Sequence, residues 1–457
     1  MIIRGIFRRY DIRGVVGSEL TEEAVHATGR GFAALLAERG VEAKVVVGRD
    51  NRPSGTALRN ALVAGLRECG VTVTDIGVVP TPTMYWCLHN LDVAAGIQVT
   101  GSHNPPEFNG LKLCVGRASL HGEGIQRLYE LATGTEFPSG AGAVTERGVL
   151  DAYVDDIVAR VGPLSRPLRV VADCGNGVAS LVAARLLKRI GAKATMLFAE
   201  SDGTFPNHHP DPTVVENLED LIKAVKAGGA DLGIGFDGDA DRIGLVDARG
   251  TIIWGDYLLM LYARDVLARN GPGQPIIFDV KCSQALPDAI ERAGGVPVMW
   301  KTGHSLIKEK MKELDAPLAG EMSGHMFFTE GFYGHDDALY AAGRLLRIVA
   351  DDGRPVHEML ADVPRFVSTP ELRVDCADDR KFIVVASAKA WFRTRHEIID
   401  VDGVRVLYGD GWGLIRASNT QPILVLRFEA RTQERVTEIR TEFSEWLATQ
   451  GIAFSIT

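Results

Sequence analysis

Residues 97–112 read IQVTGSHNPPEFNGLK, and they place a serine hydroxyl on a polar loop. The apolar residues 94–99 predict a buried strand, and Gly101 and the prolines at 105–106 end regular structure on both sides of Ser102. Ser102 is therefore expected at the end of a strand. Taken alone, the loop is better explained as a polar turn held by local hydrogen bonds, so its chemistry depends on the other loops of the chain.

A lysine follows this loop closely in the sequence. Asn109 and Gly110 predict a second turn, and Lys112 comes just after it. We expect Lys112 to reach back toward the serine.

The length and composition indicate a soluble protein with several domains. A chain of 457 residues is too long for one hydrophobic core, so we expect three or four domains of ~100 to 150 residues. Hydrophobic residues at 46%, charged residues at 24% and a mean hydropathy of +0.04 exclude the disordered and fibrous classes.

Several partners and sites are disfavoured by the same composition. No apolar run approaches the ~20 residues of a membrane helix, and a signal peptide is missing, so we expect a cytoplasmic protein without a membrane partner. The net charge of −9 argues against nucleic acid. The six cysteines form no CxxC pair, which argues against zinc and disulfides and predicts small buried residues.

The chain contains an internal repeat of about 100 residues, longer than the repeats of solenoid proteins. A buried strand that ends in polar residues occurs three times, as VVVGRD (45–50), VVADCG (170–175) and IIFDVK (276–281). Each is followed by a strand that ends in a polar loop: GSHN (101–104), DGDADR (237–242) and GEMSGH (320–325). Because helices alternate with these strands, we expect three related α/β domains with largely parallel sheets and with ligands at the strand ends.

The last part of the chain has a different pattern. From about Arg365 it alternates strands with glycine turns and ends in an amphipathic helix over 435–450, which predicts an α+β domain. The expected domains are 1–150 with the serine loop, 151–252 with DGDADR, 253–365 with GEMSGH, and 366–457 with RASNTQP.

The acidic loop is the sharpest chemical signal. Asp237, Asp239 and Asp241 alternate with small residues, and three carboxylates so close together repel unless a cation lies among them. Oxygen ligands of this kind suit Mg²⁺. The alternatives are a solvated acidic turn and a calcium loop, but an EF-hand is disfavoured because Ala248 stands at loop position twelve.

Two further loops carry polar groups suited to a sugar phosphate. In GEMSGH, Glu321 and Ser323 could grip vicinal hydroxyls and His325 could move protons, although a turn with satisfied hydrogen bonds is an equal explanation. The loop RASNTQP (416–422) suits a phosphate, with a β-turn beside a surface arginine as the alternative. Its donors are Arg416, Ser418, Asn419 and Thr420, with Arg427 as a further charge.

TGSHNPP, DGDADR, GEMSGH and RASNTQP, in this order and spread over the whole chain, resemble the four active-site loops of the α-D-phosphohexomutase superfamily, specifically of the bacterial phosphomannomutase/phosphoglucomutase enzymes. The resemblance implies three related α/β domains and a C-terminal α+β domain around a central cleft. It implies reversible phosphoryl transfer between C1 and C6 of mannose and glucose phosphates, through a phosphoserine and a reorienting 1,6-bisphosphate. Mg²⁺ and glucose 1,6-bisphosphate, as activator and intermediate, are the implied cofactors, hexose phosphates the partners, and we expect a monomer.

The same resemblance assigns roles to residues. It makes Ser102 the phosphoserine and implies that Mg²⁺ binds to its phosphate and to Asp237, Asp239 and Asp241. It assigns the sugar hydroxyls to Glu321 and Ser323, and the phosphate that is not transferred to Arg416, Ser418, Asn419 and Thr420. Tyr10, Lys281, His304 and His325 resemble further substrate contacts of the family.

Two residues are candidates for the general base that takes up the hydroxyl proton. Lys112 is the first candidate base, on the condition that neighbouring cations lower its pKa, and His325 is the second. Arg13 and Arg242 are expected to act electrostatically, since positive side chains offset phosphate charge in an acidic chain.

Other functions stay open. A phosphoglucosamine mutase is the alternative within the superfamily, and a magnesium-dependent sugar phosphatase that uses Ser102 is a second reaction class. A non-catalytic sugar-phosphate sensor is disfavoured because the serine and all three aspartates are present. One departure from the family pattern is Ala240, where glycine is common.

Overall fold

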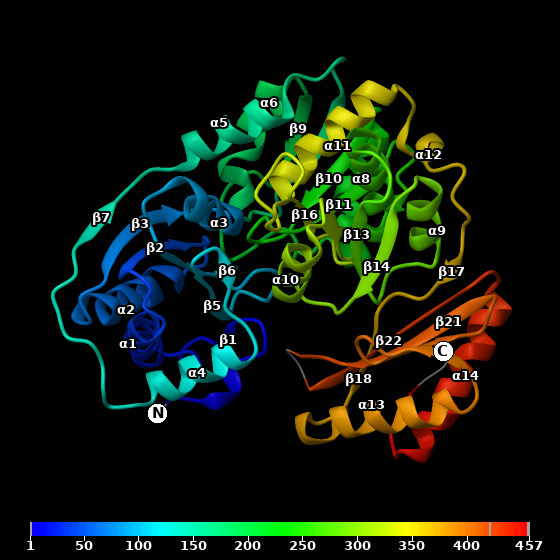
Figure 1. The fold of residues 1–457 in the computed structure, drawn as a ribbon. Coiled ribbons are helices and arrows are strands. Elements are labelled where there is room, and N and C mark those ends of the chain that lie inside the picture. Colours follow the sequence, from blue (N-terminus) through cyan, green and yellow to red (C-terminus); the bar gives the residue numbers. More distant parts are fainter. Residues whose placement is uncertain (1, 420–421, 455–457) are drawn as a thin grey trace.

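The computed structural model describes residues 2–419 and 422–454, and its strands form four sheets. Figure 1 shows the first sheet in blue and cyan at one side, the green second and third units beside it, and the orange and red C-terminal unit below the third. The predicted fold class, three related α/β domains with mixed sheets followed by an α+β domain, is confirmed. The domain boundaries stay a prediction, and the short strand β12 (Ile252–Ile253) lies across one of them.

The first unit has a seven-stranded mixed sheet with the order β1-β5-β4-β2-β3-β7 and with β6 beside β5. β2, β3, β4 and β7 are parallel, whereas β5 is antiparallel to its neighbours. The strands are β1 (Ile12–Val15), β2 (Lys44–Arg49), β3 (Thr72–Val78), β4 (Ala95–Val99), β5 (Phe108–Val115), β6 (Ala118–Ser119) and β7 (Val144–Glu146). The helices are η1 (Arg4–Ile6), α1 (Glu22–Glu38), α2 (Gly55–Glu68), α3 (Thr81–Asn90) and α4 (Glu123–Ala132).

The second unit has a five-stranded sheet with the order β12-β11-β10-β8-β9. β8, β9 and β10 are parallel, and β11 is antiparallel to β10. The remaining strands are β8 (Arg169–Asp173), β9 (Lys193–Leu197), β10 (Leu232–Phe236) and β11 (Ile243–Asp247). The helices are α5 (Leu150–Val161), η2 (Val178–Leu181), α6 (Ala183–Ile190), η3 (Val215–Leu218) and α7 (Glu219–Gly228).

The third unit has a four-stranded sheet with the order β14-β13-β15-β16, in which only β16 is antiparallel. The strands are β13 (Pro275–Asp279), β14 (Val296–Trp300), β15 (Leu318–Gly320) and β16 (Met326–Phe328). The helices are α8 (Gly255–Asn270), α9 (Ala285–Arg292), α10 (His304–Leu314), α11 (Ala338–Asp352) and α12 (Val356–Met359).

The three polar loops occupy the same place in the three sheets. Each one follows a strand that runs parallel to the central strand, and each leads into the antiparallel neighbour. The pairs are β4 and β5, β10 and β11, and β15 and β16. The internal repeat seen in the sequence is therefore a repeat of topology.

The C-terminal unit has a six-stranded antiparallel sheet that is covered by two helices. The strands are β17 (Val367–Ser368), β18 (Leu372–Asp375), β19 (Glu397–Ile399), β20 (Val404–Leu407), β21 (Gly411–Ala417) and β22 (Ile423–Ala430). The helices are α13 (Asp378–Arg393) and α14 (Gln433–Thr449). This unit has a hydrophobic core of its own, whereas one continuous core joins the second and third units and reaches α3 of the first.

Local features of the fold follow from particular residues. Helix α1 begins after Thr21, whose Oγ1 accepts a hydrogen bond from Ala24 N (3.1 Å). Residues 178–190 do not form a single helix, because the 3₁₀ turn η2 ends before Val182 and α6 begins after it. All six cysteines are buried and unpaired, as predicted. Among residues 2–419 and 422–454, the helices are too short or too polar to cross a bilayer.

The predicted turn at Asn109 and Gly110 was wrong. Both residues lie inside β5, which is paired on one side with β1 and on the other with β4. Gly110 is required by this packing, because a Cβ there would lie 2.1 Å from Ile12 O. Lys112 therefore projects from a strand in the sheet.

A buried arginine connects the C-terminal unit to the third unit. Arg405 of β20 has no exposed surface, and its Nη1 donates to Val280 O (2.8 Å) and Cys282 O (2.7 Å). The guanidinium carbon also lies 3.8 Å from the centre of the Trp412 ring. Arg405 therefore holds the C-terminal sheet against the end of β13.

We predict that Arg405→Met lowers the midpoint of thermal unfolding of the C-terminal unit. The substitution leaves two buried carbonyls without donors, at a cost of about 1–3 kcal/mol each. Differential scanning calorimetry measures the shift. Arg393→Met is the matched control, because Arg393 lies in the same unit, is mostly exposed and pairs with Asp400 at the surface. Equal midpoints for the two variants would contradict this account of the interface.

Candidate active site

Ser102 lies where the loop between β4 and β5 meets the acidic loop of the second unit. It is 3% exposed, and its Oγ is 3.3 Å from Asp237 Oδ2. The acidic loop approaches so closely that a Cβ at Gly238 would lie 2.5 Å from Ser102 O. Glycine at that position therefore allows the two loops to touch. The structure brings the predicted nucleophile and the predicted metal loop together.

The three aspartates form one buried cluster. Asp237, Asp239 and Asp241 have no exposed surface, and ligand oxygens from all three lie within 4.8 Å of one another. Burial and the charges of the other two aspartates raise the pKa of Asp237 well above its ordinary value. Ala240 between them has φ +62°, in the left-handed region, which explains why glycine suits this position in the family.

Lys112 is a cation that pairs with the aspartate cluster. Its Nζ donates to Asp239 Oδ2 (2.7 Å) and also contacts Asp241 Oδ2. Burial favours the neutral amine, but the two carboxylates outweigh burial and raise the pKa of Lys112 above its ordinary value. The condition set for Lys112 as a base, a pKa lowered by neighbouring cations, is therefore not met by these contacts, because the nearest charges are negative.

The cluster fits a divalent cation. Three carboxylates face one ammonium group, and Asp239 Oδ1 is buried without a hydrogen-bond partner in the described part of the chain. Asp239 Oδ2, by contrast, accepts hydrogen bonds from Thr81 Oγ1 (2.6 Å) and Thr100 Oγ1 (3.2 Å). A buried anionic oxygen without a donor is costly unless a cation binds it. Hard oxygen ligands of this type favour Mg²⁺ over softer metals.

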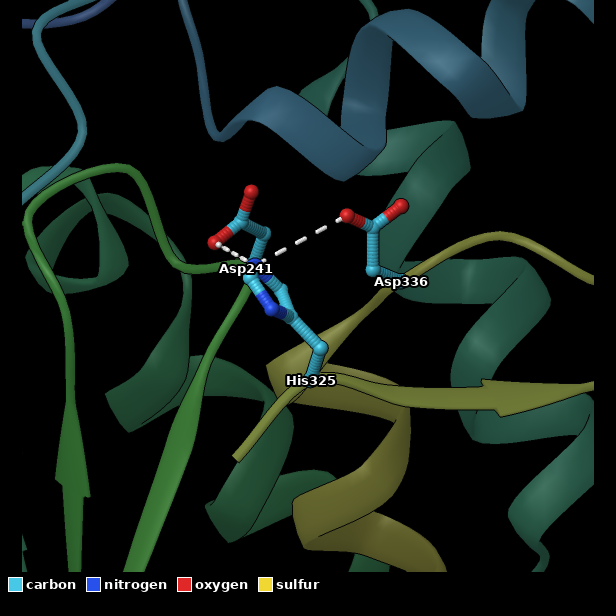
Figure 2. A group of neighbouring side chains, drawn as sticks. All are labelled: Asp241, His325 and Asp336. Atoms are coloured by element: carbon cyan, nitrogen blue, oxygen red, sulfur yellow. Dashed lines mark hydrogen bonds and ion pairs between the residues drawn. The ribbon is translucent and has the colours of Figure 1, made fainter. Parts of the chain in front are cut away.

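His325 lies between carboxylates from two units. Its Nδ1 is 2.7 Å from Glu321 Oε2, and its Nε2 is 3.1 Å from Asp241 Oδ1. Figure 2 shows the imidazole ring of His325 between Asp241 and Asp336. Asp336 Oδ2 lies 3.9 Å from His325 Nε2. Burial disfavours the charged ring, but the carboxylates outweigh burial and raise the pKa of His325 to about 9. At neutral pH both ring nitrogens therefore donate.

The other polar groups of GEMSGH are held beside His325. Burial favours the neutral acid, but the hydrogen bond from His325 lowers the pKa of Glu321 to about 2. Glu321 Oε1 accepts from Gly303 N (2.6 Å). Ser323 Oγ is 3.4 Å from Glu321 Oε2, so the carboxylate and hydroxyl predicted to grip a sugar are neighbours.

Asp336 was missed by the sequence analysis. It is fully buried, and it accepts a hydrogen bond from Lys308 Nζ (3.0 Å) while His304 Nδ1 is 3.4 Å away. Burial and the nearby lysine lower the pKa of His304 to about 3, so this ring is neutral. The only sequence signal was an Asp-Asp pair after β16, which suggests no partner.

The loop of the C-terminal unit meets the start of the chain. Asn419 Nδ2 donates to the Tyr10 hydroxyl (2.6 Å), which in turn donates to Thr302 O of the third unit (2.8 Å). Glycine at 303 is required there, because a Cβ would lie 2.7 Å from the Tyr10 ring. Tyr10 therefore connects three parts of the chain around the site. The predicted residue Thr420 lies outside the described residues.

The predicted cations are spread around these loops. Arg13 contacts Gly101 O and pairs with Asp11 (2.5 Å), and Arg242 Nε is 3.3 Å from His325 Nε2. Two more cations belong to the third and C-terminal units. Arg416 binds Asp402 (2.9 Å), Lys281 binds Glu371 (3.1 Å), and Ser418, beside Arg416, is buried.

Carboxylates at the ends of the central strands hold two of these loops. Asp50, after β2, accepts from Gly101 N (2.9 Å), and Asp279, at the end of β13, accepts from Met322 N (3.0 Å). In the second unit the equivalent Asp173 binds Gly175 N (2.8 Å) instead. The repeated final aspartate of VVVGRD and IIFD was the signal that could have identified this support.

Family models match nearly the whole chain. The three α/β/α domains of phosphoglucomutase/phosphomannomutase match residues 4–138, 151–250 and 254–366, and the C-terminal domain of the same family matches 371–445.

Individual proteins are similar over the same length. A phosphomannomutase/phosphoglucomutase of Pseudomonas aeruginosa is 49% identical over 97% of this chain and 95% of that protein. A phosphoglucomutase of Neisseria gonorrhoeae is 47% identical over 97% of this chain and 96% of that protein. The crystal structure of a phosphoglucomutase/phosphomannomutase family protein from Burkholderia thailandensis has 44% identity and a TM-score of 0.93, and covers 99% of this chain and 100% of that one. Because four ordered loops, four domain models and full-length relatives agree, the chain belongs to the phosphoglucomutase/phosphomannomutase family.

Proposed function

We propose that this chain, a hexose phosphate mutase by family, moves a phosphoryl group between C1 and C6 of mannose and glucose phosphates by way of a phosphoserine at Ser102. One observation carries the proposal: Ser102 Oγ is 3.3 Å from the buried acidic cluster. The surroundings of this hydroxyl suit a transferring phosphoryl group, because Lys112 contacts two aspartates of the same cluster and the loops of the other units carry donors for sugar and phosphate.

The reaction consists of two phosphoryl transfers in opposite directions. In the first, the bond between Ser102 Oγ and phosphorus breaks while the free hydroxyl of the hexose phosphate bonds to that phosphorus and loses its proton. The product is a hexose 1,6-bisphosphate, which turns end over end. Its other phosphoryl group then returns to Ser102 Oγ. Nothing is oxidised or reduced, and one proton moves in each half.

Charge on the transferring group requires positive neighbours. Asp237, Asp239 and Asp241, with phosphorylated Ser102, are the residues that would hold Mg²⁺, which neutralises charge on a transferring phosphoryl group when it is bound. Arg13 and Arg242 add fixed positive charge from two units. These side chains explain how an acidic protein accommodates a bisphosphate.

The proton of the attacking hydroxyl is transferred to Lys112 or His325. Each side chain is buried against carboxylates and is protonated, so each begins the cycle as a proton donor. In the first transfer the acting group gives its proton to the departing Ser102 Oγ and takes up the proton of the attacking hydroxyl, so its own charge is the same before and after the step. We keep Lys112 as the first candidate, because it projects from the strand that follows the serine loop.

Substrate contacts come from the third and C-terminal units and from Tyr10 at the start of the chain. Glu321 and Ser323 present a carboxylate and a hydroxyl to the sugar, with Tyr10, Lys281 and His304 near them. Arg416, Ser418, Asn419 and Thr420 bind the phosphate that is not transferred. Glucose 1,6-bisphosphate serves as activator, because it phosphorylates Ser102 when the serine is free. The enzyme acts as a monomer on these small molecules.

The central test is a coupled assay of the purified protein with Mg²⁺ and catalytic glucose 1,6-bisphosphate. We predict comparable turnover of mannose 1-phosphate and glucose 1-phosphate, and its loss in Ser102→Ala because the acceptor oxygen is missing. Ser165→Ala, at an exposed serine, is the control and keeps full activity. Preference for glucosamine 1-phosphate would identify a phosphoglucosamine mutase, and release of inorganic phosphate without isomerisation would identify a phosphatase.

Metal dependence provides a second prediction. Chelation with EDTA should abolish turnover and added Mg²⁺ should restore it, while Asp239→Asn weakens Mg²⁺ binding measured by calorimetry because one charged ligand is lost. Asp220→Asn, at an exposed position of α7, binds Mg²⁺ as the unmodified protein does. Full activity in EDTA would overturn the magnesium assignment.

Lys112 gives a prediction in which two quantities change in opposite directions. Lys112→Met should lower kcat by roughly 10²–10⁴-fold, because a positioned proton-transfer group is lost. The same variant should bind Mg²⁺ more tightly, because the ammonium no longer competes for Asp239 and Asp241. Lys188→Met, at an exposed lysine of α6, should change neither quantity. Weaker Mg²⁺ binding in Lys112→Met would mean that the lysine supports the cluster and does not compete with metal.

A further inference from the structure

Arg52 is a buried arginine whose side-chain hydrogen bonds, within the described residues, go to the backbone of the serine loop and to its own neighbour Asp50. Its side chain has no exposed surface, and its Nε donates to Asp50 Oδ2 (3.1 Å). The remaining N–H groups donate to carbonyls of the loop: Pro105 O (2.5 Å), Phe108 O (3.0 Å), Ser102 O (2.8 Å) and Asn104 O. Every N–H group of the guanidinium is therefore used, and all but one bind the loop that carries the nucleophile.

The loop is shaped to receive this guanidinium. A Cβ at Gly101 would lie 2.2 Å from Arg52 Cζ, so glycine is required for the planar group to lie against the backbone. Asp50 completes the contact from the other side, because its Oδ2 accepts from Thr100 Oγ1 (2.9 Å) and Gly101 N (2.9 Å). The Asp50 carboxylate therefore accepts hydrogen bonds from donors of the loop, and the Arg52 guanidinium donates to the carbonyl oxygens of the same loop.

The contact fixes an unusual backbone conformation at the nucleophile. Ser102 has φ +51°, in the left-handed region that residues with a side chain seldom adopt. Arg52 donates to the carbonyl oxygen of Ser102, and the backbone N–H of Ser102 donates to Thr100 Oγ1 (2.8 Å). Such a conformation persists only where the surroundings fix it, and here it directs Oγ toward Asp237.

Residues of the second unit pack against Arg52 and its neighbour Asn51. The Phe205 ring centre is 5.1 Å from Arg52 Cζ, and a Cβ at Gly203 would lie 2.3 Å from Asn51 O. Asn51 Nδ2 also donates to Asn176 O of the second unit (2.7 Å). The position of Arg52 is therefore tied to the unit that supplies the aspartates.

We propose that Arg52 is a positioning residue that holds the Ser102 backbone so that Oγ faces the acidic cluster. The inference rests on the proposed phosphoryl transfer at Ser102. Arg52 itself does not reach substrate, because its guanidinium is buried and fully bonded within the protein. A lysine in its place keeps the charge but cannot span four carbonyls of one loop, since an ammonium lacks the planar fork.

The test compares Arg52→Lys with Arg59→Lys, which removes a guanidinium of the same unit that contacts Asp75 and Asn60, away from the serine. We expect Arg52→Lys to lower kcat about 100-fold, the effect of a small misplacement of a reacting group, while KM for glucose 1-phosphate stays unchanged. Hydrogen exchange followed by mass spectrometry should become faster in residues 101–108 alone. Arg59→Lys should keep kcat and the exchange of that loop.

If Arg52→Lys does not fold, Gly101→Ala provides a second test. The methyl group of the new alanine displaces the Arg52 guanidinium but leaves it in the protein. The same loss of kcat and the same local exchange are expected. The inference fails if Arg52→Lys keeps kcat, if KM rises with an unchanged kcat, or if exchange rises throughout the unit. Absence of mutase activity in the unmodified protein would instead refute the proposed function, and loop exchange in the two variants would still test the positioning.

Discussion

The buried carboxylate of Asp241 is the charge on which the arrangement of the first three units depends. Lys112 of the first unit contacts one of its oxygens, and His325 of the third unit lies 3.1 Å from the other. A carboxylate without exposed surface is tolerated only when it is paired, and removing one partner of a buried pair costs about 3–5 kcal/mol. The ionic contacts that hold the units together are therefore the same contacts that prepare the site for an anionic substrate.

The repeated topology explains why these groups converge. In each α/β unit the functional loop joins a parallel strand to its antiparallel neighbour, so all three loops leave their sheets at corresponding places. The three units differ in the contacts that support these loops. Asp50 and Asp279 each accept a backbone N–H of their loop, whereas Asp173 binds its own turn. The acidic loop of the second unit is held instead by its contacts with Ser102 and Lys112.

The sequence predicted the fold class and the repeated succession of strand and polar loop, because those depend on local patterns of strands, glycines and polar residues. The chemistry of each loop stays a prediction. The sequence did not predict the direction of the pKa shift at Lys112, because Asp239 is 127 residues away and only the folded chain brings it within 2.7 Å. Asn109 and Gly110 look like a turn in the sequence, and their pairing with β1 overrides that preference. Arg52 and Asp336 carry no motif, so their partners are visible only in three dimensions.

The most direct test of the account follows the phosphoryl group itself. The protein would be incubated with glucose 1,6-bisphosphate labelled with ³²P. One portion would be digested and the labelled residue mapped by mass spectrometry. A second, undigested portion would be given unlabelled glucose 1-phosphate. The account predicts that the label is found on Ser102 and then passes to the sugar as bisphosphate. Label on another residue, or label that leaves only as inorganic phosphate, would contradict it.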